Sequence, residues 1–392
     1  MQNNTKLSPK NIRWFIKPPD ILLSFLLFSI LSSLTSCEHA KLPEASCTAY
    51  LTDSITFPCQ TRILSSVVYG SDKKTNSYFY DDEDNQRVIC FNDKGSSIDA
   101  ISYPHSLPIG KISGFYAITE DSFAFIEHKK LFLYGVKSKK IKGFDIGGYG
   151  IKCEGAFGQY PLEISDSLAF YYSFEDTFAI NTQKKWELYM RLTYNETVFN
   201  LNRERIENIK AGGFPIEIYP DSNCYYSFCP ARCINYKQHE IIYLYQQSNT
   251  IYIYNYLNKT FRKTIVPNPH FYPNEKFDMN KIGDFDYISK YLTENCRNQN
   301  IIYNKFKNEY YLTSTYKRNY ENSNSDETAS PIDKTWSILV LDSNFSIKTE
   351  INFPAKKYDF ASILALQKGV LVGYYSNFNS TSNYSKYAVF EF

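Results

Sequence analysis

Short runs in which apolar and polar residues alternate recur along this chain, and each is followed by a polar turn and a second such run. The clearest pairs are residues 336–342 with 345–353, and residues 251–256 with 261–266. Alternation with a period of two is typical of β-strands that bury one face, and a short polar turn between two such runs predicts an antiparallel hairpin. We therefore expect a chain built mainly from hairpins.

The hairpins recur at a spacing that suggests a repeat. Further pairs are expected at residues 87–91 with a return to Tyr103, at 131–136 with 141–146, and at 178–181 with 186–194. The second strands end near residues 104, 146, 194, 267 and 354, and the spacing lengthens where loops are inserted. A period of about 40–50 residues with about four strands per unit indicates a β-propeller.

The two ends of the chain supply one further unit. After Pro354 three strands are expected, at residues 363–366, 369–375 and 386–392, and no fourth follows them. A single strand-like run, residues 50–57, stands far upstream. If it pairs with the last strand, the ring closes and two exposed edges disappear. The predicted fold is therefore an all-β, six-bladed β-propeller over residues 50–392, its last blade closed by the N-terminal strand.

Two polar insertions lengthen the later units. Residues 268–300 include a stretch, 285–296, that is expected to form a short helix or an irregular cap, and residues 318–334 read as a flexible hairpin loop. Long loops on a rigid scaffold are common places for binding surfaces.

The first 36 residues have the pattern of a signal peptide. Four basic residues between Lys6 and Lys17 precede the apolar run 21–34. A run of fourteen residues, broken only by small serines, is too short to cross a hydrocarbon core of about 30 Å as a helix. A basic leader, a short apolar core and small residues at its end predict residues 1–36 as a cleaved export signal.

The apolar run ends in Leu34-Thr35-Ser36-Cys37, which resembles the bacterial lipobox. The resemblance implies that Cys37 is lipidated and that residues 37–49 tether the domain to a membrane, since two or more acyl chains give stable anchoring. Glu38 is not the aspartate that retains such proteins at the inner membrane, which favours the outer membrane of the cell envelope. The alternative is ordinary cleavage near Ser36, which leaves Cys37 a plain thiol.

Charge and composition narrow the function classes. The chain carries a net charge of +2, and its 35 Tyr and 29 Phe residues fit pleated, half-buried sheets better than helices. Residues 1–36 contribute +3, so the mature part is near −1. Such a balance provides no electrostatic footprint for nucleic acid, and we expect no nucleic-acid partner.

The cysteines are compatible with export. Besides Cys37 there are eight, Cys47, Cys59, Cys90, Cys153, Cys224, Cys229, Cys233 and Cys296. An even number outside the cytoplasm permits disulfides, although the sequence does not choose the pairing. The crowded group at 224, 229 and 233 lacks the usual CxxC spacing of a zinc site, so structural thiols or disulfides are favoured over a metal.

Residues typical of catalytic or cofactor sites are scarce. The five histidines, His39, His105, His128, His239 and His270, form no HExxH or His-x-His motif, and no Gly-x-Ser-x-Gly elbow occurs. Gly147, Gly148 and Gly150 precede a strand and fit a blade boundary better than a phosphate loop, which needs a helix N-terminus. We expect no metal and no cofactor, and catalytic residues cannot be named.

Two other features have competing interpretations. The acidic run 81–84 could hold calcium, but it lacks the spaced carboxylates of a calcium loop and reads better as a solvated turn. Six tyrosines stand in adjacent pairs and could stack on sugars, although neighbouring residues of a strand point to opposite faces and half of them should pack between blades. These are Tyr171, Tyr172, Tyr225, Tyr226, Tyr310 and Tyr311.

Several of these stretches together resemble a known family. The lipobox, Glu309-Tyr-Tyr, the run 336–345, Phe353-Pro354 and Lys368-Gly-Val-Leu are similar to the TolB-like six-bladed propeller lipoproteins of Bacteroidetes, catalogued as a domain of unknown function. The resemblance covers roughly residues 50–392. It implies the fold and the envelope location, and it carries no active-site residues.

Two functions remain. The first is a lipid-anchored binding or scaffold module that recognises a protein, a peptide or a glycan. This hypothesis predicts that no cluster of perturbed carboxylates or histidines lines the central channel. The second is a propeller enzyme, a lyase or hydrolase, with carboxylates converging on that channel from different blades. Such sites are assembled from residues far apart in sequence, so the sequence leaves the choice open.

Overall fold

The structure is a computed structural model that describes residues 49–58, 66–69, 76–82, 85, 87–102, 112–127, 129–147, 151–154, 161–175, 196–207, 230–271, 277–281, 284–318, 334–379 and 383–392. The chain divides into two compact units, Met1–Ala45 and Ser46–Phe392. The predicted signal peptide, Cys37 and the tether to residue 48 lie outside the described residues. They therefore stay predictions.

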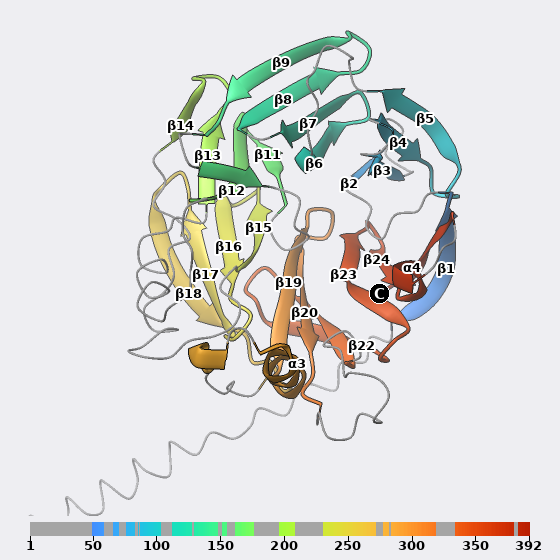
Figure 1. The fold of residues 1–392 in the computed structure, drawn as a ribbon, viewed down its shortest axis with the longest axis vertical. Helices are drawn as coiled ribbons and strands as arrows, with labels where there is room; N and C mark the ends of the chain where they lie inside the picture. The colour runs from blue at the N-terminus through green and yellow to red at the C-terminus, as the bar shows by residue number, and fades with distance from the viewer. Residues whose placement is uncertain are drawn as a thin grey trace, which may run out of the picture. The chain divides into compact units, whose positions relative to one another are not determined.

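The second unit is a six-bladed β-propeller, in which six small antiparallel sheets follow one another around a ring (Figure 1). Blade 1 consists of β2 (Ser66–Tyr69), β3 (Asn76–Asp82), β4 (Arg87–Phe91) and β5 (Ser97–Ser102). Blade 2 consists of β6 (Ile112–Thr119), β7 (Ser122–Glu127), β8 (Lys130–Gly135) and β9 (Lys140–Asp145). Blade 3 consists of β10 (Ile151–Glu154), β11 (Glu163–Ser165), β12 (Leu168–Glu175), β13 (Glu196–Asn200) and β14 (Arg205–Glu207).

The second half of the ring repeats the pattern. Blade 4 consists of β15 (Ala231–Asn235), β16 (Glu240–Leu244), β17 (Thr250–Asn255) and β18 (Thr260–Ile265). Blade 5 consists of β19 (Arg297–Asn304), β20 (Glu309–Thr315), β21 (Trp336–Leu341) and β22 (Ile347–Phe353). Blade 6 consists of β23 (Tyr358–Ala365), β24 (Gly369–Tyr374), β25 (Ser385–Glu391) and β1 (Tyr50–Phe57).

The first strand of each blade lies nearest the axis of the ring. These inner strands contact one another from blade to blade, β2 with β6, β6 with β10 and β11, β15 with β19, β19 with β23, and β23 with β2. Side chains on the inner strands of different blades are thereby brought close together although they are far apart in sequence.

The ring closes as the sequence predicts. β1 pairs antiparallel with β25, from Tyr50 opposite Glu391 to Phe57 opposite Ser385. Phe57 is fully buried, and its ring lies 5.1 Å from that of Phe91 and 5.3 Å from that of Tyr78, both in blade 1. The N-terminal strand therefore both completes blade 6 and packs it against blade 1.

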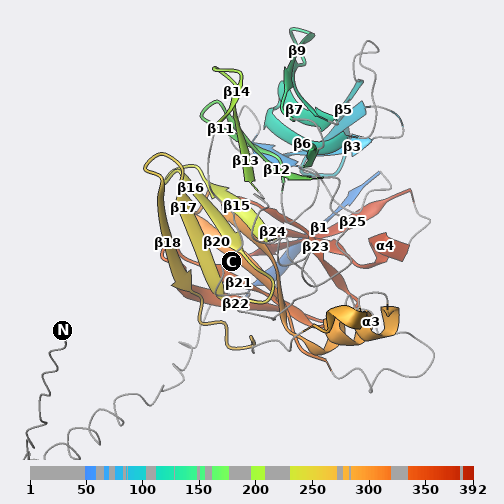
Figure 2. The ribbon, with the colours of Figure 1, turned by 60° about the vertical axis from the view of Figure 1, so that its left-hand side comes forward.

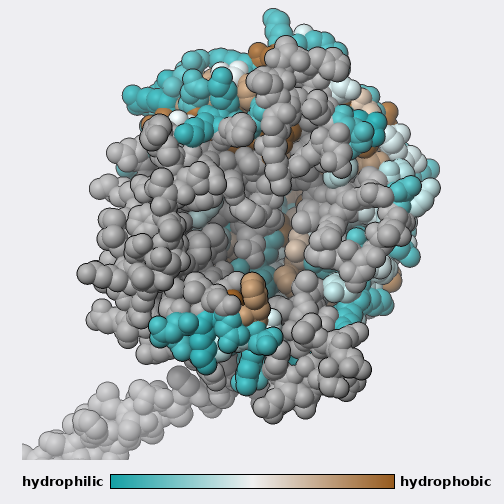
Figure 3. All heavy atoms as spheres, in the orientation of Figure 1, coloured by the Kyte–Doolittle hydropathy of each residue, from teal (hydrophilic) through white to brown (hydrophobic). Residues whose placement is uncertain are grey.

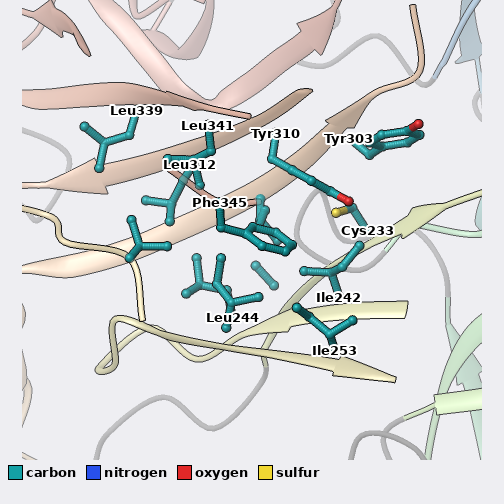
Figure 4. Close-up of a cluster of buried hydrophobic side chains, with 14 residues drawn as sticks. Cys233, Ile242, Leu244, Ile253, Tyr303, Tyr310, Leu312, Leu339, Leu341 and Phe345 are labelled. Carbon is teal, nitrogen blue, oxygen red and sulfur yellow. The ribbon is translucent and has the colours of Figure 1, made fainter. Parts of the chain in front are cut away.

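The apolar core lies between the blades. The close-up in Figure 4 shows one cluster, in which Ile242 and Leu244 of blade 4 face Leu312 and Leu339 of blade 5. Each fully buried aliphatic side chain of this kind contributes about 1.5–3 kcal/mol to folding. The alternating residues of the strands supply these contacts because one face of each sheet meets the next sheet.

Five hairpins share one turn geometry. Four residues separate the two strands, and the last of the four has a positive φ of 51–57°, the left-handed region that most side chains avoid. These residues are Lys139, Glu204, His239, Lys259 and Asn308. In four of the turns the preceding strand ends in Asn, whose side-chain oxygen accepts hydrogen bonds from two backbone N–H groups of the turn.

Blade 3 differs from the prediction. β12 pairs with β13, and β13 with β14, so the outer strands are residues 196–200 and 205–207, which the sequence analysis did not predict. The hairpin predicted at 178–181 and 186–194 lies outside the described residues. The inner strand is interrupted as well, because β10 and β11 both pair with β12. Alternation alone cannot tell which of several consecutive strand-like runs is the paired one.

The predicted helix is present in the insertion before blade 5. α3 spans Phe285–Glu294, and Asp284 caps its first turn by accepting a hydrogen bond from the Tyr287 N–H at 3.0 Å. Figure 2 shows α3 outside the six sheets. Most of the predicted loop 318–334 lies outside the described residues. Among the described residues, no helix is long and apolar enough to cross a membrane.

Candidate binding site near the propeller axis

A series of hydrogen-bonded polar side chains connects blade 2 with blade 4 on the side of blade 3 that faces the axis of the ring. The Tyr116 hydroxyl, on β6, lies 3.4 Å from the hydroxyl of Tyr236, the first residue after β15. The Tyr236 hydroxyl donates a short hydrogen bond to Glu163 Oε2, at the start of β11. Blades 2 and 4 are not neighbours in the ring, so these side chains can meet only on the axial side of blade 3.

Arg232 forms a buried ion pair with Glu163. Its side chain is completely buried, and its Nη1 donates to Glu163 Oε1 at 3.0 Å. Its Nη2 donates to the backbone oxygens of Pro161 and Phe170, at 2.6 and 3.3 Å. The break in the inner strand of blade 3 brings the Pro161 carbonyl to this guanidinium.

A second carboxylate lies on the other side of the same guanidinium. Glu196 Oε2, on β13, is 3.2 Å from Arg232 Nε, and both side chains are fully buried. The Tyr243 hydroxyl also donates to Glu196 Oε2, at 3.2 Å. One buried cation thus holds two carboxylates, and such an arrangement is stable only when each charge keeps its partners.

The surroundings shift the protonation of these groups. Burial raises the pKa of Glu163, and Arg232, Tyr236 and Lys305 lower it in part. Burial raises the pKa of Tyr116 to about 12 and holds that of Tyr236 well above its ordinary value. Both phenols therefore stay protonated and act as hydrogen-bond donors at neutral pH.

Lys305 is a further cation at this place. It follows β19 in the hairpin turn of blade 5, and its side chain is exposed. β19 contacts β15 of blade 4, and the ring of Tyr303, two residues before Lys305, lies 6.3 Å from the ring of Tyr236. The surrounding protein partly desolvates Lys305 and lowers its pKa, and the charge of Glu163 raises that pKa in part. We call Tyr116, Glu163, Arg232, Tyr236 and Lys305 the near-axis site. The face drawn in Figure 3 is hollowed near its middle.

This cluster was not expected for a binding module. The binding hypothesis predicted no perturbed carboxylates near the channel, whereas Glu163 is one and lies beside the buried pair of Glu196 and Arg232. The sequence offered one signal, Arg232 as the single charged residue of the strand 231–235. Their partners could not be found, because Tyr236 is 73 residues from Glu163 and 120 from Tyr116.

The two described histidines, His239 and His270, are not part of the near-axis site. His239 is the last residue of the turn between β15 and β16, and its Nδ1 lies 3.2 Å from the Tyr256 hydroxyl and 3.5 Å from Asp166 Oδ2. His270 pairs with Glu350 at 3.1 Å, and its ring lies tilted against that of Tyr316 with the ring centroids 4.5 Å apart. His39, His105 and His128 lie outside the described residues.

The other candidate residues have structural surroundings where they are described. Asp82, in the acidic run, is paired with Arg87 at 2.7 Å, while Glu83 and Asp84 lie outside the described residues. Over the described parts of the chain, no three His, Cys, Asp or Glu side chains are grouped as metal ligands would be. Four of the paired tyrosines are buried in the strands, which confirms their packing role, namely Tyr171, Tyr172, Tyr310 and Tyr311. Tyr225 and Tyr226 lie outside the described residues.

The described cysteines and glycines are also structural. Cys90, Cys233 and Cys296 are buried free thiols. Cys47, Cys59, Cys224, Cys229 and the side chain of Cys153 lie outside the described residues, so the choice between disulfides and free thiols stays untested for them. The strand predicted after the glycines is β10, at a blade boundary, while Gly148 and Gly150 themselves are not described.

Comparison with known proteins adds support for the fold. No protein-family model matches the chain, and no curated protein matches it. Among solved structures, a member of the duf4221 family from Bacteroides vulgatus is similar with a TM-score of 0.69 and 16% identity, over 88% of this chain and 98% of that chain. At this identity the likeness shows the propeller fold, and membership of the TolB-like family stays a prediction.

Two more distant structures are similar over most of their length. One is a Bacteroides fragilis protein whose name suggests export, with a TM-score of 0.45 and 11% identity over 86% of this chain and 93% of that chain. The other is a luciferin-regenerating enzyme, with a TM-score of 0.43 and 4% identity over 86% and 95%. Propellers host many unrelated functions, so neither assigns an activity here.

Proposed function

We propose that this protein is an exported, lipid-anchored β-propeller that binds a polar ligand, a glycan or a peptide, at the near-axis site. The observation that carries the proposal is the hydrogen-bonded chain from Tyr116 through Tyr236 to Glu163, assembled from three blades and backed by a buried arginine. A fold that needed only packing here could fill the space with apolar side chains at lower cost, because burying charges is expensive. Polar groups held in place on a rigid scaffold are typical of ligand sites.

An array of glycans and peptides, probed with the full chain in detergent, tests the binding role. We expect at least one class of ligand to be retained, and Tyr236→Phe to weaken that binding about tenfold, since it removes a hydroxyl from the site. Tyr384→Phe, at an exposed tyrosine of the last hairpin, is the matched control and should bind like the unchanged protein. If Tyr236→Phe retained the ligand as well as the unchanged protein does, the proposed site would be contradicted.

Anchoring through Cys37 is tested separately. Mass spectrometry of the mature N-terminus should show acylated Cys37, and Cys37→Ser should release the protein from the membrane fraction. Cys47→Ser, ten residues further along, should leave it bound. In a cell with two membranes we expect the outer one, and Glu38→Asp should shift the protein toward the inner one.

A propeller enzyme is the second candidate, and the raised pKa of Glu163 favours it. A carboxyl that keeps its proton above its usual pH range can act as a general acid for a lyase or hydrolase. Turnover of sugar-acid, lactone or peptide substrates, with and without calcium, would establish this function if Glu163→Gln abolished the turnover while binding persisted. Absence of turnover across these classes would leave the binding role.

A further inference from the structure

The charges of the near-axis site are unevenly matched. Arg232 is held by Glu163 and Glu196, whereas Lys305 forms no ion pair with any described residue, and its ammonium lies 5.4 Å from the centre of the Phe306 ring. Glu163 cannot easily serve as its partner, because Oε1 already accepts from Arg232 and Oε2 from Tyr236. The site thus contains an accessible cation whose natural complement is an anion.

The tyrosine hydroxyls of the site set a second requirement for the ligand. Tyr236 has one proton and gives it to Glu163, so it can only accept at its contact with Tyr116. Tyr116 then donates its own proton to Tyr236, and its oxygen keeps an open acceptor position. Among the described residues no donor fills that position. A ligand hydroxyl could fill it, since a hydroxyl brings a proton to donate.

We propose that the near-axis site takes a small carboxylic acid that also carries hydroxyl groups, with Lys305 holding the carboxylate and Tyr116 accepting from a hydroxyl. This inference rests on the proposed binding function and names its ligand class. Lys305 supplies a charge-assisted hydrogen bond, which is about twice as strong as a neutral one. Tyr116 supplies the preference for a hydroxylated ligand over a plain acid.

Calorimetric titration of the full chain in detergent with three probes tests the proposal. Glucuronate has both groups, glucose has hydroxyls without a carboxylate, and propionate has a carboxylate without hydroxyls. We expect glucuronate to bind about tenfold or more tightly than either other probe. Equal affinities, or no binding of glucuronate, would overturn the proposal.

Variants assign the binding to Lys305. Lys305→Met should weaken glucuronate binding about tenfold or more and leave glucose binding unchanged. Lys237→Met is the matched control, because Lys237 is an exposed lysine in the corresponding turn of blade 4. Equal losses in both variants would overturn the assignment. If the arrays instead find a neutral ligand that needs Tyr236, the binding function stands and only the ligand class fails.

Discussion

Arg232 keeps two carboxylates, Glu163 and Glu196, within ion-pair distance of one guanidinium, and no part of its side chain reaches solvent. Because Arg232 is fully buried, its desolvation is a large part of the free energy that is needed to form the near-axis site. Removing one member of a buried charge cluster leaves the others desolvated and unpaired, which costs far more than losing an exposed pair. The residue thus couples the site to the stability of blades 3 and 4.

Arg232→Met should lower the free energy of unfolding by about 3–5 kcal/mol, measured by urea denaturation. Arg262→Met is the control, since Arg262 bonds Glu240 at 3.0 Å with half of its side chain exposed, and the expected loss there is below about 1 kcal/mol. Equal losses would mean that the buried cluster has no special role in stability.

Glu163 should make the stability depend on pH in a defined direction. Burial raises its pKa in the folded state, so the folded protein holds this proton more firmly than the unfolded chain does. The carboxyl therefore stabilises the folded state increasingly as the pH falls from the raised pKa of Glu163 toward the ordinary pKa of a glutamate. This stabilisation is lost as the pH rises again. Unfolding curves of the unchanged protein and of Glu163→Gln should converge or cross in acid. Parallel curves between pH 4 and 8 would contradict the raised pKa.

At the scale of single residues, the sequence predicted little of the site. A charged residue inside a strand of blade 4 was visible, but nothing in the spacing related Arg232 to Glu163, 69 residues away. Contacts across the axis depend on how the blades follow one another around the ring. Only the closed ring, which turns the inner strands of blades 2 and 4 toward one axis, brings Tyr116 and Tyr236 together.

At the scale of elements, the shared hairpin turn explains how strands of different composition keep the same register. The turn demands a left-handed residue in its fourth position, and the chain places Lys, Glu, His or Asn there instead of glycine. For such residues the left-handed conformation is unfavourable by about 1 kcal/mol or more, whereas glycine adopts it without this strain. The paired Asn side chains offset part of that cost by bonding the turn.

Lys259→Gly should therefore raise the free energy of unfolding by about 0.5–1 kcal/mol, because Lys259 has a φ of 56° in the turn between β17 and β18. Lys263→Gly, four residues later within β18, should lower it by about the same amount, since glycine weakens a strand. Thermal or chemical unfolding of both variants checks the opposite signs. A loss in both would contradict the strain at Lys259.

Strand prediction succeeded where alternation was strong and failed where several runs competed. The hairpins of blades 2, 4 and 5 follow the predicted runs closely, as β21 and β22 show at Trp336–Leu341 and Ile347–Phe353. In blade 3 the pairing strands at 196–200 and 205–207 were not predicted, while the predicted hairpin at 178–194 lies outside the described residues. Pairing partners depend on tertiary packing, which a local pattern does not contain.

At the scale of the whole molecule, one strand holds the ring together. β1 is separated from its partner β25 by almost the entire propeller, yet Phe57 and Ile55 from β1 enter the same core as Phe91 and Leu371. Without β1, strand β25 would become an exposed edge, and blades 6 and 1 would lose their shared core. Exposed edges of this kind promote association between chains.

A chain lacking residues 1–57 should accordingly aggregate or unfold at lower urea concentration than the unchanged protein. A peptide of residues 49–58, added in trans, should restore stability, because it can pair with β25 and return Phe57 to its pocket. The same peptide with Ile55→Ser and Phe57→Ser keeps the backbone pairing groups but loses the buried side chains. It should rescue far less, since burying one phenylalanine is worth about 3–5 kcal/mol. Full stability of the shortened chain on its own, or equal rescue by both peptides, would show that the ring does not depend on this closing strand.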